Sequence, residues 1–107
     1  MSAITTHVLD TSAGKPAAGL PVVLEFQMSG EWHEIGRGST DSDGRLRTLV
    51  PVDNELQPGT YRISFDTSAK SAFYPRVAVE FIVHDPAQHY HVPLLLSPFG
   101  YSTYRGS

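Results

Sequence analysis

The chain has 107 residues, of which 40 % are hydrophobic and none is cysteine, and its formal net charge is −3. This length and composition fit a single domain over residues 1–107 and exclude a second domain for a cofactor. The 8 basic residues are scattered among 11 acidic ones, which argues against a nucleic-acid partner. The lack of cysteine excludes disulfides, thiolate catalysis and zinc–thiolate sites.

The sequence carries no signal for a membrane or for secretion. No apolar run approaches the ~18 to 20 residues needed to cross a bilayer. The segment before position 8 has neither the positive charge nor the long apolar stretch of a secretion signal. We therefore expect no membrane partner and a cytoplasmic protein, or a peroxisomal one if the source is eukaryotic.

Turn-forming residues divide the chain into pieces of strand length. Glycine, proline and Asp-Gly signals stand at positions 16, 19–21, 30, 43–44, 51, 58–59, 75, 85–86 and 98–100. This spacing is typical of a β-sandwich or β-barrel.

Between the turns, apolar and polar side chains alternate with a period of two, which places each apolar series on the core side of a strand. In chain order the series are Ile4, Thr6 and Val8; Val22, Leu24, Phe26 and Met28; Tyr61, Ile63 and Phe65; Val77, Val79, Phe81 and Val83; and Tyr90, Val92, Leu94 and Leu96. Residues 32–40 alternate poorly and are predicted as a strand only from the flanking turns. Residues 67–73 are predicted as one short helix, because a capping residue and two alanines precede Tyr74-Pro75. The fold class predicted is all-β.

Three of the five histidines lie on the outer faces of predicted strands. His7 alternates with Ile4 and Val8, and His89 and His91 are out of phase with the core series of their strand. Two interpretations from spacing alone are solvated surface histidines and a metal site made by the His-x-His pair. No Asp or Glu in the same stretch offers a third ligand, so we expect no metal.

Apolar residues accompany these histidines on the outer face. Leu9 lies beside His7, and Leu95 follows His91 on the same side of its strand. Pro93 lacks a backbone donor, so we expect it at an edge, a bulge or a strand end. Because the chain has no spare segment to cover this face, we expect another subunit to cover it.

The segment 40–47 contains the second candidate feature. Asp43-Gly44 is a hairpin-type turn signal, and it brings Arg45 to the start of a strand. A solvated arginine after a common turn is the alternative interpretation. The acidic residues at 41 and 43 are similar to part of a calcium loop, but the glutamate that such a loop requires is missing.

Several stretches together carry a family resemblance. They are THVLD at 6–10, GKPA at 14–17, TDSDGR at 40–45 and HVPLLLSPFGYSTYRGS at 91–107. They resemble the transthyretin-related proteins, and the ending YRGS with the histidine and arginine motifs resembles their 5-hydroxyisourate hydrolase branch. The resemblance implies a two-sheet sandwich of about eight strands with one short helix. It also implies a homotetramer with active sites at the dimer–dimer interface.

The resemblance further implies an activity without a cofactor. That activity is ring-opening hydrolysis of 5-hydroxyisourate to 2-oxo-4-hydroxy-4-carboxy-5-ureidoimidazoline in urate breakdown. His7, Arg45 and His91 occupy the family's catalytic positions, and Tyr104 and Ser107 fall in its site-lining tetrapeptide.

The residue types suit this chemistry. One of His7 and His91 is expected to deprotonate water while the other positions groups or donates a proton, and the sequence does not assign these roles. Arg45 is expected to stabilise the oxyanion. Tyr104 would close the site or stack on the substrate, and Ser107 would orient water through its hydroxyl or terminal carboxylate.

Two other functions are alternatives to hydrolysis. A transthyretin-type carrier of small ligands needs neither a base nor a charged clamp, so the histidines, Arg45 and the YRGS ending argue against it. An adhesion or interaction sandwich without catalysis would tolerate loss of His7 and Arg45.

Overall fold

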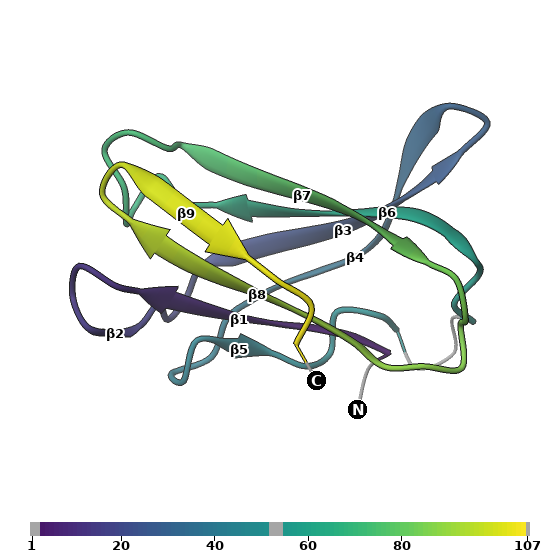
Figure 1. Ribbon diagram of the computed structural model, residues 1–107, viewed down its shortest axis with the longest axis horizontal. Coiled ribbons are helices and arrows are strands. Elements are labelled where there is room, and N and C mark those ends of the chain that lie inside the picture. The colour runs from purple at the N-terminus through teal and green to yellow at the C-terminus, as the bar shows by residue number, and fades with distance from the viewer. Residues whose placement is uncertain (1–2, 52–54, 107) are drawn as a thin grey trace.

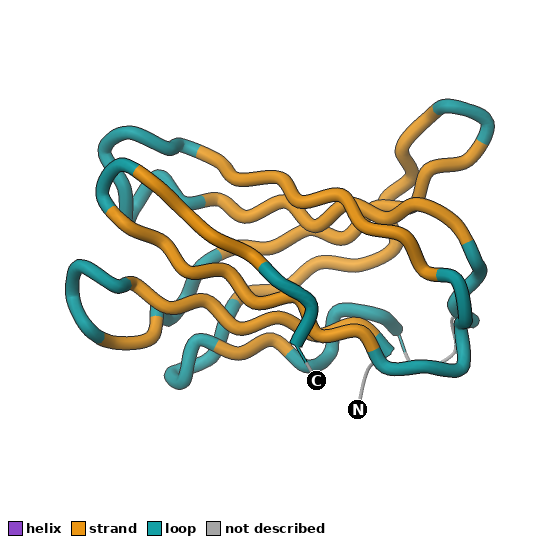
Figure 2. Tube along the Cα trace, in the orientation of Figure 1, coloured by secondary structure: helices purple, strands orange, loops and turns teal. Residues whose placement is uncertain are grey.

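The computed structural model describes residues 3–51 and 55–106, so the predicted site residue Ser107 lies outside the described part. Strands and loops make up these residues (Figures 1 and 2). The strands are β1 (Ile4–Asp10), β2 (Lys15–Pro16), β3 (Pro21–Met28), β4 (Glu31–Ser39), β5 (Arg45–Leu46), β6 (Gly59–Asp66), β7 (Arg76–Val83), β8 (Tyr90–Ser97) and β9 (Gly100–Thr103).

The strands form two sheets that Figure 1 shows as two layers. One sheet has the order β2-β1-β8-β9, with β5 also paired to β1, and the other has the order β4-β3-β6-β7. The pairs are antiparallel except β1 with β8, which is parallel. This parallel pair joins strands near opposite ends of the chain, and it carries most of the residues discussed below.

The core lies between the sheets and follows the alternation. Ile63 and Phe65 of β6 and Leu94 of β8 have no exposed surface. Met28 was expected on the core face but is 51 % exposed. Figure 1 shows the reason, since the β3–β4 hairpin extends beyond the body of the sandwich and the end of β3 has no sheet opposite it.

The poorly alternating segment is a strand, as the flanking turns predicted. β4 pairs with β3, and the register shifts between Leu24 and Glu25. Such a bulge interrupts the period of two. Gly36 adds to the irregularity, because a Cβ there would lie 1.9 Å from the backbone oxygen of Leu49. Close packing of the 47–51 segment on β4 therefore requires glycine at this position.

The helix expected over residues 67–73 is absent, and that prediction was wrong. Lys70 N and Ser71 N both donate to Thr67 O, at 3.0 and 2.9 Å, which makes a single turn. The buried Thr67 hydroxyl donates to Tyr74 O at 2.5 Å. The segment therefore closes on itself instead of continuing as a helix.

In the described part of the chain, no helix is long and apolar enough to span a membrane.

Candidate functional site

The register of the β2-β1-β8-β9 sheet brings the three expected catalytic residues onto one outer face. His7 of β1 is paired with Arg45 of β5 on one side and with Pro93 of β8 on the other. His91 is paired with Thr5, two positions before His7 on the same face of β1. Residues paired across neighbouring strands have adjacent side chains. Arg45, His7 and His91 are each half-buried.

The turn before β5 positions Arg45. The Asp41 carboxylate accepts hydrogen bonds from Asp43 N at 2.8 Å and Arg45 N at 3.0 Å. These backbone donors, with Arg45 first, hold the pKa of Asp41 below its ordinary value. Gly44 O accepts from Val8 N at 2.8 Å, which ties the turn to β1. The Asp-Gly signal in the sequence is therefore a turn fixed against the strand that carries His7.

Gly44 is the residue of this turn where a side chain would be most destabilising. Its φ is +76°, and a Cβ there would lie 2.4 Å from Val8 O. We expect Gly44→Ala to lower the free energy of unfolding by about 2–3 kcal/mol, because strained backbone and a displaced hydrogen bond add together. Urea denaturation measures the loss.

Gly14→Ala is the matched control for this prediction. Gly14 has a similar φ of +68° but open space around its Cβ position. It should lose only the backbone component, about 1–2 kcal/mol. Equal losses in the two variants would contradict a role for the contact between Gly44 and Val8.

The ring of His7 has a defined proton position. Its Nε2 lies 2.9 Å from the carbonyl oxygen of Asp43. Because a carbonyl can only accept, Nε2 carries the proton and donates it. In the neutral ring, the lone pair is then on Nδ1. The same turn that positions Arg45 therefore also orients His7.

The ring of His91 is held at Nδ1 and along one edge. Nδ1 lies 2.8 Å from Thr5 Oγ1. The ring also packs on the backbone of Gly106, where an added Cβ would lie 2.6 Å from Cδ2. Among the described residues, Nε2 of His91 has no hydrogen-bond partner. This nitrogen is available to a substrate or to water.

Burial lowers the pKa of His91 below its ordinary value of 6.5, and electrostatic interactions with Arg45 and then with His7 and His89 lower it further. The neutral imidazole therefore dominates at neutral pH. Only a neutral imidazole has a lone pair that can take a proton, so the environment suits a general base.

The titration of His91 tests this environment. We expect the imidazole signals of His91 in NMR spectra to titrate with a midpoint below 6.5. Folding disfavours the protonated ring, so the unfolded chain binds this proton first as the pH falls through 6.5. The contribution of His91 to stability is thus present above pH 6.5 and decreases below it. A midpoint at or above the ordinary value would contradict this environment.

Tyr104 lies apart from this group, in the segment that follows β9. It is 56 % exposed and helps to line a cavity of about 220 Å³ beside the β7 edge, together with Phe81, Ile82 and Arg105. No hydrogen bond joins it to His7, Arg45 or His91 in the described chain. The structure therefore brings His7, Arg45 and His91 together but not Tyr104, which precedes by two positions the Gly106 that pairs with His91.

Pro93 accounts for a gap in the hydrogen bonding between β8 and the segment that contains β9. The β8–β9 pairing ends at Leu94 and Thr103 and resumes only as a bridge between His91 and Gly106. Pro93 has no backbone N–H to contribute to the ladder between them. Its carbonyl instead accepts from the Thr103 hydroxyl at 2.7 Å. The proline lies inside an interior strand, at a gap in the ladder rather than at an edge.

Comparison with known proteins identifies the group to which this site belongs. The HIUase/Transthyretin family matches residues 4–106. The chain belongs to this family. It is 46 % identical over 110 residues to the 5-hydroxyisourate hydrolase of Salmonella typhimurium, covering 97 % of this chain and 80 % of that protein. It is 48 % identical over 119 residues to the uric acid degradation bifunctional protein TTL of Arabidopsis thaliana, covering 97 % of this chain but 37 % of that protein.

Solved structures confirm the transthyretin-like sandwich. The structure of Klebsiella pneumoniae 5-hydroxyisourate hydrolase aligns with a TM-score of 0.81 at 33 % identity and covers 100 % of both chains. Sea bream transthyretin in complex with thyroxine aligns with a TM-score of 0.88 at 31 % identity, covering 98 % of this chain and 95 % of that one. Since the fold is common to both, the residues on it must distinguish hydrolysis from ligand carriage.

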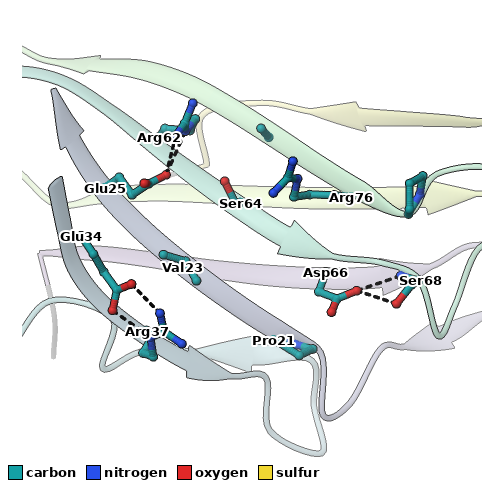
Figure 3. A pocket seen from close by; sticks show the side chains of 12 residues that line it. Pro21, Val23, Glu25, Glu34, Arg37, Arg62, Ser64, Asp66, Ser68 and Arg76 are labelled. Carbon is teal, nitrogen blue, oxygen red and sulfur yellow. Dashed lines mark hydrogen bonds and ion pairs between the residues drawn. The ribbon is translucent and has the colours of Figure 1, made fainter. Parts of the chain in front are cut away.

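A second concave surface of this HIUase/Transthyretin family member lies on the outer face of the other sheet (Figure 3). It has a volume of about 720 Å³ and carries charged side chains. Those charges are largely paired with each other, since Arg62 donates to Glu25 at 2.8 Å and Arg37 donates to Glu34 at 2.8 Å. The residues that line this surface include no histidine.

Two polar residues of the site were missed in the sequence. Thr5 hydrogen-bonds to both His89 and His91, and neither Thr5 nor His89 was among the predicted site residues. The alternation had placed His89 on the same face as His91, which was the available signal. The described residues contain no group of three or more acidic or histidine side chains that could hold a metal ion.

Proposed function

We propose that this chain hydrolyses 5-hydroxyisourate, opening the ring at its imide-like carbonyl. The observation that carries the proposal is the placement of His7, Arg45 and His91 on one outer face of the sheet. The membership of the HIUase/Transthyretin family and the 46 % identity to a bacterial 5-hydroxyisourate hydrolase support it. The second relative, from Arabidopsis, is a longer protein, so only its matching part bears on this chain.

His91 is the proposed base in this reaction. Its pKa is lowered by burial and by neighbouring positive charge, and its Nε2 has no partner among the described residues. Water attacks the carbonyl carbon while Nε2 takes its proton. The C–N bond to the ring nitrogen then breaks, the nitrogen gains a proton, and a carboxylate forms at the attacked carbon.

Arg45 and His7 act on the oxygens of the substrate in this scheme. The guanidinium of Arg45 stabilises the oxyanion that develops on the attacked carbonyl. His7, oriented through Asp43, holds the substrate through Nδ1 when its ring is neutral, or donates the Nδ1 proton to the departing nitrogen when its ring is protonated. Tyr104 and Ser107 remain proposed substrate-binding residues.

The ultraviolet decay of freshly generated 5-hydroxyisourate tests the proposal. The substrate decays unaided, so the measured quantity is the rate above background. Acceleration proportional to protein concentration supports hydrolysis. A rate equal to background with saturable thyroxine binding would instead support the carrier function that the fold also accommodates.

The assembly proposed for this activity is a homotetramer without a cofactor, acting in the cytoplasm or, in a eukaryote, in the peroxisome. Leu9 and Leu95 support an assembly, because they are half-buried apolar residues on the same outer face as the histidines. Sedimentation velocity at several protein concentrations measures the oligomeric state.

A further inference from the structure

The hydroxyl of Thr5 lies between two histidine rings. Thr5 Oγ1 is 2.8 Å from His91 Nδ1 and 3.0 Å from His89 Nε2. Thr5 is only 4 % exposed, whereas His89 is exposed. A continuous hydrogen-bonded chain therefore leads from the half-buried ring of His91, through a buried hydroxyl, to a ring in contact with solvent.

The single hydroxyl proton of Thr5 restricts the directions of these two hydrogen bonds. A hydroxyl has one proton, so it donates to one ring nitrogen and accepts from the other. When His89 Nε2 is unprotonated, Thr5 donates to it and accepts from Nδ1 of His91. The lone pair of neutral His91 is then on Nε2, as a base at that nitrogen requires. When His89 Nε2 carries a proton, both hydrogen bonds reverse: His89 donates to Thr5, and Thr5 donates to Nδ1 of His91. The proton of neutral His91 is then on Nε2.

We propose that Thr5 and His89 are positioning residues that set the tautomer of His91 and relay its proton to solvent. This inference rests on the function proposed above. As Nε2 of His91 takes a proton from the attacking water, its Nδ1 proton passes to Thr5 Oγ1 and the hydroxyl proton of Thr5 passes to Nε2 of His89. His91 ends neutral, and the exposed His89 releases one proton to water.

The surroundings of His91 favour passing the proton onward. Burial comes first among the causes that disfavour a protonated His91, and the charge of Arg45 comes second. Arg105 donates to Gln88 at 2.9 Å and stacks on the ring of Tyr90 at 4.5 Å, and it is not among the groups that lower the pKa of His91. A proton held on the more exposed His89 lies farther from the positive charge of Arg45 on β5.

Four variants separate the relay from simple packing. Thr5→Val keeps the shape of the side chain and removes the hydroxyl, while Thr5→Ser keeps the hydroxyl. His89→Phe keeps a ring without nitrogens, and His84→Phe is the matched change at another exposed histidine. We expect Thr5→Val and His89→Phe to lower kcat for 5-hydroxyisourate about 10- to 100-fold with KM changed less than about twofold. Thr5→Ser and His84→Phe should keep kcat near that of the parent chain.

Nitrogen-15 NMR of the imidazoles supplies a readout that packing alone would not change. In the parent chain we expect the Nδ1–H tautomer of His91 at neutral pH, and in Thr5→Val and His89→Phe a shift toward the Nε2–H tautomer. Parent-like kcat and tautomer in both variants would overturn the relay. A change in Thr5→Val alone would overturn the role of His89.

Two results remain interpretable if a variant or the assay fails. If Thr5→Val does not fold, the kcat of His89→Phe and the tautomer of His91 in that variant still decide between the outcomes. If the parent chain does not accelerate the decay, the proposed function fails, whereas the tautomer of His91 in His89→Phe still tests the hydrogen-bonded chain.

Discussion

His91→Ala should lower the rate of 5-hydroxyisourate decay above background by about 10²- to 10⁴-fold, the usual contribution of a general base. The reason is the loss of Nε2, the ring nitrogen that has no partner among the described residues and belongs to a ring with a lowered pKa. Initial rates at several substrate concentrations, each corrected for the spontaneous reaction, give kcat and KM for the variant.

His84→Ala is the matched control for this change. His84 is an exposed histidine that follows β7, outside the residues of the site. It should retain the parent rate. His91→Ala must also remain folded, because its ring packs on Gly106, and thermal unfolding checks this. A folded His91→Ala protein with nearly the parent rate would remove His91 from the mechanism and leave His7 as the candidate base.

Arg45→Met should lower kcat/KM about 10²- to 10³-fold, the range for losing one oxyanion-stabilising group. It should also raise the pKa of His91, because the charge of Arg45 is one cause of its lowered value. Kinetics and NMR titration of His91 measure these two effects separately. Arg45→Lys keeps the charge without the planar fork, so it should restore the pKa of His91 more fully than the rate.

Arg76→Met is the corresponding change on the other sheet, where Arg76 lines the surface drawn in Figure 3. It should change neither kcat/KM nor the titration of His91. If Arg45→Met alters the titration but not the rate, Arg45 contributes charge to the face without contacting the reacting oxygens.

Most of the sandwich could be predicted because its strands alternate strongly. The period of two identified the cores of β6 and β8 and the outward direction of His7 and His91. The same period wrongly predicted that Met28 is buried, because the β3–β4 hairpin extends beyond the opposite sheet there. It also gave no sign that the buried Thr67 hydroxyl would bond to Tyr74 O and end the expected helix after one turn.

The hydrogen bonds within the site were harder to predict. Thr5 contacts His89 and His91 across 84 and 86 positions of sequence, through the parallel pairing of β1 with β8. Alternation states which face a residue occupies, but it does not state which strand lies beside it or in which register. Thr5 therefore looked like an ordinary strand residue, and His89 looked like a surface histidine.

The missing N–H of Pro93 also has a consequence for local stability. Beyond Thr103 the C-terminal segment is attached to β8 by the bond from Gly106 N to His91 O, at 2.8 Å, instead of by a continuous ladder. Segments held by few backbone bonds open at a lower free energy than the domain unfolds, so the Gly106 amide should exchange with solvent earlier than those of β8. Because Gly106 also covers one edge of the His91 ring, we expect opening of this segment to expose that edge of the ring to water.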